Sequence, residues 1–219
     1  MYITEPTTMA TDYMLGILCL MWGWKTRRLT SQRCAAQSLW TRAFFATGVA
    51  ALLGGTVHGF TLILQEPWIT GLWNGALYLT GFASFFMLAS VVLLYLPRTI
   101  GRLSLVLCVL KLGTYLVWVF NDQDFRFVVY DYGSSLLIIL GFQLFSLYKR
   151  QSILAGWIAS GVLLSFIGAA IQQSGFSLHT HFNHNDFFHV IQACAFYFFY
   201  RGGLLFTRIL NTNSIPTSE

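Results

Sequence analysis

The stretch GFASFFMLASVVLLYL, residues 81–96, decides the fold class of this chain. It is the second half of a run in which no residue between Glu66 and Arg98 carries a formal charge. A helix needs about 20 mostly apolar residues to cross the hydrocarbon core of a bilayer. Because a helix satisfies its own backbone hydrogen bonds in lipid, this run predicts a transmembrane helix from Trp68 to Leu96.

Other long apolar runs follow one another along the 219 residues. The chain is 56% hydrophobic and 10% charged, whereas soluble domains carry about 25% charged residues. We therefore expect an all-α integral membrane protein, with one bundle of seven transmembrane helices over residues 1–210 and a disordered tail over residues 211–219. The other six predicted spans are Met9–Trp24, Thr41–Leu64, Ile100–Phe120, Phe125–Tyr148, Ser152–Gln172 and Phe187–Ile209.

Basic residues predict the orientation of this bundle. Lysine and arginine gather after the first, third and fifth predicted spans and near the end of the seventh. The positive-inside rule makes these connections cytoplasmic, so the N-terminus is expected outside and the C-terminus in the cytoplasm. The net charge of +5 then follows from topology, and no nucleic-acid partner is expected. We expect a multi-pass protein of a plasma or bacterial inner membrane, with membrane lipids as partners; its oligomeric state stays open.

Ionisable residues inside spans are the first candidates for function. An uncompensated Lys or Asp costs about 2.5–3.5 kcal/mol at the membrane centre, so such groups usually pair or face a wet cavity. Lys111, near mid-membrane, is predicted to pair with Asp131 on the next helix. The remaining two are Asp12 and His58, and His58 is flanked by Gly55 and Gly59 at a small-xxx-small spacing that favours close helix packing.

The stretch HTHFNHNDFFHVI, residues 179–191, holds four of the five histidines. Asn183, Asn185 and Asp186 are favoured N-cap residue types, so the seventh helix is predicted to begin within residues 183–186. Asp186 and His189 are three residues apart and share a helix face. We therefore expect Asp186 to hold one ring nitrogen of His189, as carboxylates commonly do behind a metal-binding histidine.

These polar groups are candidates for a zinc site at the outer ends of the helices. A catalytic zinc ion needs three nitrogen, oxygen or sulfur ligands and an open position for water. His58, His184 and His189 are the candidate ligands. Asp12 and Asp131 are the candidate catalytic residues, because a carboxylate near the bound water can act as general base.

The stretch HNDFFHVIQACAFYFFYRG, residues 184–202, resembles the last span of the CREST superfamily of seven-span membrane hydrolases, which includes alkaline ceramidases and progestin and adipoQ receptors. In that superfamily a His-x-x-x-His pair opens the last span and an earlier span supplies Ser-x-x-x-His. The resemblance implies a zinc-dependent hydrolase of lipid amides, in which His189 and His58 match two of the three zinc ligands. The sequence departs from the pattern at Asn185 and Gly54, where the superfamily has histidine and serine.

Other classes of protein stay open. An outer cluster of histidines also suits a sensor or receptor-like protein, because histidine titrates near physiological pH. A haem protein with His58 and His189 as axial ligands and a purely structural membrane protein are further alternatives. The stretch TEPTTMATDY, residues 4–13, resembles the start of a small uncharacterised seven-span family, which implies a fold but no activity.

Overall fold

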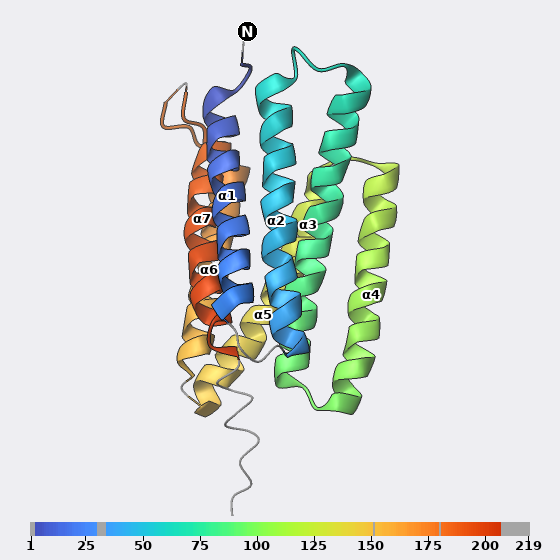
Figure 1. The fold of residues 1–219 in the computed structure, drawn as a ribbon, viewed down its shortest axis with the longest axis vertical. Helices are drawn as coiled ribbons and strands as arrows, with labels where there is room; N and C mark the ends of the chain where they lie inside the picture. Colours follow the sequence, from blue (N-terminus) through green and yellow to red (C-terminus); the bar gives the residue numbers. More distant parts are fainter. Residues whose placement is uncertain (1–2, 30–33, 151, 180, 207–219) are drawn as a thin grey trace, which may run out of the picture.

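A computed structural model describes residues 3–29, 34–150, 152–179 and 181–206 as a bundle of seven α-helices (Figure 1). Within these ranges there is no strand, only an isolated bridge between His179 and Phe182. The start of α1 and the end of α7 lie at opposite ends of the bundle. The helices are α1 (Pro6–Leu29), α2 (Ala35–Phe60), α3 (Glu66–Tyr95), α4 (Arg98–Asn121), α5 (Arg126–Arg150), α6 (Ile153–Ser174) and α7 (His184–Gly203).

Five of these helices, α2 to α6, are long and apolar enough to cross a membrane. This finding confirms the predicted all-α membrane bundle and indicates an integral membrane protein. In the described part of the chain, α1 and α7 fall outside that set of five. The reason is their polar content, since α1 carries Asp12 and a basic last turn, and α7 carries Asp186 and His189.

Six helices form a closed ring in the order α1, α2, α3, α5, α6 and α7, in which α7 returns to α1. α4 lies outside this ring, chiefly against α3, at the edge of the bundle in Figure 1. Gly81 on α3 leaves room for the ring of Tyr115 on α4, and the Tyr115 hydroxyl donates a hydrogen bond to the Leu77 carbonyl at 2.7 Å. The ring of six helices therefore encloses the interior of the bundle, and α4 supports it from outside.

A charged pair also holds α4 to the ring. The Lys111 ammonium donates to the Asp131 carboxylate and, at 2.7 Å, to the Asp131 backbone carbonyl. Asp131 is buried and the Lys111 side chain is one quarter exposed. The predicted pairing of Lys111 with Asp131 is confirmed, and each charge has a partner inside the bundle.

The predicted bounds of three spans were wrong by several residues. The first was predicted over Met9–Trp24, but α1 runs from Pro6 to Leu29. The second span was predicted over Thr41–Leu64, but α2 begins six residues earlier, because the Cys34 sulfur accepts a hydrogen bond from the Gln37 backbone N–H at 3.3 Å and caps the helix. The seventh was predicted over Phe187–Ile209, but α7 ends at a glycine pair, Gly202 and Gly203. The predicted tail over residues 211–219 lies outside the described residues.

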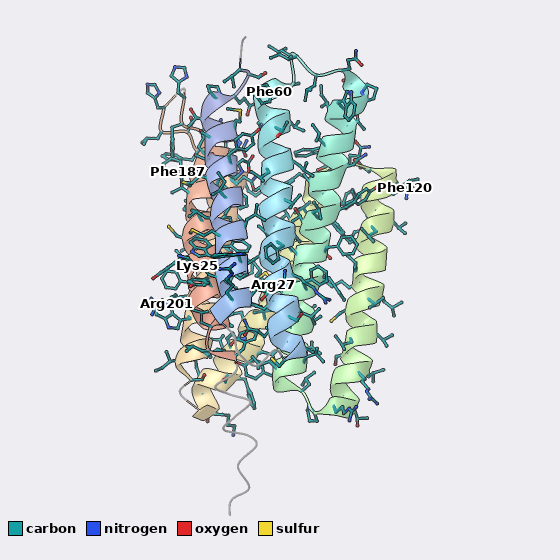
Figure 2. The ribbon with its side chains drawn as sticks, viewed as in Figure 1. Lys25, Arg27, Phe60, Phe120, Phe187 and Arg201 are labelled. Carbon is teal, nitrogen blue, oxygen red and sulfur yellow. The ribbon has the colours of Figure 1, made fainter. Side chains whose placement is uncertain are left out.

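Basic side chains gather at the end of the bundle opposite the start of α1. Figure 2 shows Lys25, Arg27 and Arg201 toward this end, and Phe60 and Phe187 toward the other. The last turn of α1, the first turns of α4 and the last turns of α5 and α7 all meet there and carry lysine or arginine. This arrangement places most of the basic residues at one end, with Arg126 at the other, and the cytoplasmic location of the basic end remains a prediction.

Candidate functional site

The ring of six helices surrounds a cavity of about 410 Å³. This volume falls in the range of about 300–1,000 Å³ that is typical of small-molecule sites. Among the described residues, α4 contributes nothing to its wall. The space exists because small side chains face it from four helices, namely Ala50, Ala51, Gly54, Ala76, Gly133 and Ala169.

The cavity runs from the end of the bundle where the chain begins toward its middle. Its wall on α2 extends from Thr47 to His58, which is roughly 16 Å at the rise of an α-helix. His58 lies at the outer end, where its side chain is 25% exposed. Leu136 and Phe196 lie farther along α5 and α7 and line the deeper part. The cavity therefore has an accessible end with ionisable side chains and a mainly apolar inner part.

A buried network of three side chains lies beside the polar end. Asp12 Oδ1 is 3.2 Å from His189 Nε2, and Thr11 Oγ1 is 3.1 Å from His189 Nδ1. Asp12 and His189 are both buried and both line the cavity. Because both ring nitrogens are engaged, the imidazole is fixed in one orientation and holds the Asp12 carboxyl at the cavity wall.

Glycines on α2 explain why Asp12 reaches the cavity. A Cβ atom on Gly55 would lie 2.8 Å from Asp12 Cβ, and Met9 occupies the space beside Gly59. The prediction that Gly55 and Gly59 allow close helix packing is therefore confirmed, and the partner helix is α1. Asp12 Oδ2 faces Gly54, where an added Cβ would lie 3.6 Å away, so the carboxyl group is directed at a wall with no side chain.

The predicted role of Asp186 was wrong. Its Oδ2 accepts a hydrogen bond from the Asn183 backbone N–H at 2.7 Å, and the Asn183 side chain accepts from the N–H of Asn185 at 2.8 Å. This capping box confirms the predicted start of α7 near Asn183. The capping box uses Oδ2 of Asp186, and its Oδ1 has no hydrogen-bond partner among the described residues. The carboxyl group that reaches His189 is that of Asp12 on α1.

The five predicted site residues are only partly brought together. Asp12, His58 and His189 line the same cavity. His184 is the first residue of α7, half-buried and outside the cavity wall, and Asp131 is bound to Lys111. Asp131 therefore lies apart from the other candidates in a pair that joins α4 to α5.

His58 has a partner that the sequence did not identify. His58 Nδ1 is 3.0 Å from Glu5 Oε2. The backbone N–H of Thr4 donates to the Gly59 carbonyl at 3.0 Å, and that of Glu5 donates to the His58 carbonyl at 3.2 Å. The segment before α1 is thus fastened to the end of α2 beside the mouth of the cavity.

The side chains as placed do not fit a zinc ion. In the described ranges, no group of three or more His, Cys, Asp or Glu side chains is arranged to hold a metal ion. A zinc ion on His189 would displace either Asp12 or Thr11, and His58 Nδ1 is engaged by Glu5. This geometry gives no support to a zinc site with His58, His184 and His189 as ligands, and that prediction remains untested.

Metal analysis of the detergent-purified protein, after removal of any affinity tag, tests that prediction. From the engaged ring nitrogens we expect no stoichiometric zinc in the wild type. Zinc near one equivalent that is lost in both His58→Ala and His189→Ala would contradict this expectation and place the two histidines in one metal site.

Two buried polar atoms in the cavity wall have no hydrogen-bond partner among the described residues. They are Gln192 Oε1 and Thr47 Oγ1. Gln192 is 6% exposed and lies one helical turn after His189. A buried polar atom without a partner costs about 1–3 kcal/mol. Each atom is therefore an unmet hydrogen-bonding group on a residue that lines the cavity.

Several of these residues could have been found in the sequence. Gln192 is three residues after His189 and Thr11 is next to Asp12, so each shares an element with a candidate already identified. Thr47 and Gly133 carry no comparable signal, because a threonine or glycine in an apolar span is usually a packing residue. Their role depends on which face of α2 and α5 lines the cavity, and only the fold shows that.

The bundle defines a polytopic helical membrane protein, and the cavity lies between its helices. The chain belongs to a family of unknown function (DUF6962), whose family model matches residues 7–207. No curated protein and no solved structure matches the chain. None of these comparisons adds to the resemblance to the CREST superfamily.

Proposed function

We propose that the protein is a receptor-like membrane protein that binds a small amphiphilic molecule in the cavity between its helices. The observation that carries the proposal is the distribution of polarity along the cavity. Its outer end holds the ionisable side chains of Asp12, His58 and His189. Its inner part is lined mainly by apolar side chains, with the hydroxyl groups of Thr47, Thr80 and Ser165 among them. A ligand with one polar head and an apolar chain matches this distribution.

The unpartnered atoms of Gln192 and Thr47 support the proposal. Ligand sites are typically apolar clefts in which a few polar groups fix the orientation of the ligand. The Asp12 carboxyl is held in place by His189, and Thr11 holds the far side of the His189 ring. Such a site is organised before the ligand arrives, which lowers the entropic cost of binding.

A pair of glycine substitutions on α5 tests this proposal. Gly133 lines the cavity, and a Cβ atom there would meet nothing within 4 Å among the described residues. Gly133→Leu should place a branched side chain in the path of a ligand, and its Cβ meets no atom of the wall. Gly141 is also free of neighbours at that distance but is exposed on the outside of the bundle, so Gly141→Leu is the matched control.

Binding is measured by native mass spectrometry of the protein from lipid nanodiscs, with decylamine, decanoate and decan-1-ol as probes. We expect at least one probe to bind one-to-one to the wild type and to Gly141→Leu, and to be lost from Gly133→Leu. Retention of no probe by the wild type, or equal retention by the two glycine variants, would show that the cavity is not a ligand site.

The hydrolase that the CREST resemblance implies would use the same cavity. It would take a lipid amide as substrate and would require zinc for activation of water. Because His189 and His58 are engaged as described, this alternative depends on the metal analysis above.

A further inference from the structure

We infer that the head group of the ligand is a protonated amine, bound by the Asp12 carboxylate. This inference rests on the proposed function, because it requires that the cavity takes an amphiphile. It assigns the chemical class of the ligand from the hydrogen-bonding capacity and charge of the cavity wall.

Asp12 and Gln192 place carboxylate and amide oxygens, which accept hydrogen bonds, in the wall of the cavity. Asp12 Oδ1 is engaged by His189, and Oδ2 faces the cavity wall at Gly54. Gln192 Oε1 is a buried acceptor without a partner. An ammonium group carries three N–H donors and no acceptor, so these oxygens can satisfy it. A carboxylate head group would place its own oxygens against those of Asp12 and Gln192, and none of these oxygens would then have a hydrogen-bond donor.

The charges around the cavity favour a cation. No lysine or arginine is among the described residues that line it. Arg126, at the outer end, binds Asp124 at 2.7 Å, and this guanidinium holds the pKa of the Asp124 carboxyl below its usual range. Glu5 lies at the mouth beside His58. A cation therefore meets acidic groups on its way in and no unpaired basic side chain in the wall.

Aromatic side chains complete the environment of an ammonium group. The cavity wall includes Trp73, Phe125 and Phe188 near its outer end, and the Trp73 ring is 6.3 Å from the Phe125 ring and 6.5 Å from the His58 ring. The faces of aromatic rings attract ammonium groups. An ammonium ion can bind an ionised Asp12 directly. A neutral amine can take the proton from a protonated Asp12 carboxyl, and the bound pair is again ammonium and carboxylate.

The three probes distinguish the head groups, because they share one alkyl chain. We expect the wild type to bind decylamine about tenfold more tightly than decan-1-ol, as a charge-assisted hydrogen bond would give, and decanoate least tightly. Asp12→Asn should bring the amine and alcohol affinities close to each other while decan-1-ol remains bound. Glu66→Gln removes an exposed acid outside the cavity wall and should leave the preference unchanged.

The two proposals can fail separately. Binding of decan-1-ol or decanoate as tightly as decylamine by the wild type would overturn the amine assignment, and loss of that binding in Gly133→Leu would still support a ligand cavity. An amine preference that persists in Asp12→Asn would overturn the role of Asp12. Retention of no probe by the wild type would overturn both proposals.

Discussion

Replacement of Asp131 by alanine should lower the free energy of unfolding by about 3–5 kcal/mol, the usual cost of removing one partner from a buried ion pair. The Lys111 ammonium would then remain within the bundle without its counter-ion. The substitution also weakens the principal polar contact between α4 and α5 in the described part of the chain, because only the bond from Lys111 to the backbone carbonyl of residue 131 is left. Equilibrium unfolding by SDS titration of the purified protein measures the loss.

Two further variants separate the charge from the packing. Lys111→Met combined with Asp131→Asn removes both charges with little change in shape, and it should recover most of the stability that Asp131→Ala loses. Asp122→Ala, at an exposed position after α4, should have little effect. If Asp131→Ala unfolds at the same SDS fraction as Asp122→Ala, the pair does not stabilise the bundle.

Replacement of Trp40 by alanine should cost about 3–5 kcal/mol, as large-to-small changes of buried aromatic residues do. Trp40 is fully buried between α2 and α7. Its indole N–H donates to the Phe199 carbonyl at 3.1 Å, and its ring packs edge-on against Phe199 at 5.8 Å. A Cβ atom at Gly203 would lie 2.6 Å from the indole, so the fit between these helices is tight.

Trp68→Ala is the control for this second prediction, because Trp68 lies on α3 and is 66% exposed. It should change the unfolding midpoint far less than Trp40→Ala, since few contacts are lost. Similar midpoints for the two variants would contradict a stabilising contact between Trp40 on α2 and the end of α7. The same SDS titration serves for both.

The fold followed from the sequence because each apolar run has one stable solution in lipid. The run before Arg98 is long and uncharged and can only be a helix there, and it forms α3. Lys111 and Asp131 could be paired from the sequence because they lie on consecutive helices near one depth. The helix ends were less predictable, because a cap such as Cys34 is one short-range contact that the apolar pattern does not reveal.

The candidate site was harder to predict, because it depends on which helices are neighbours. The sequence identified Asp12, His58 and His189 as polar groups in an apolar chain, and the three line one cavity. It assigned Asp186 to His189 by their spacing on one helix. The contact with Asp12 requires α7 to lie against α1, and spacing along one helix carries no information about that.

The most direct measurement of the central claim is an experimental structure of the nanodisc-embedded protein with the probe that native mass spectrometry selects. We predict density for one extended molecule inside the ring of six helices, with its head group at hydrogen-bonding distance from Asp12 and its chain passing Gly133. A cavity filled by the protein's own side chains, or a probe bound only on the outer surface beside α4, would contradict the proposal.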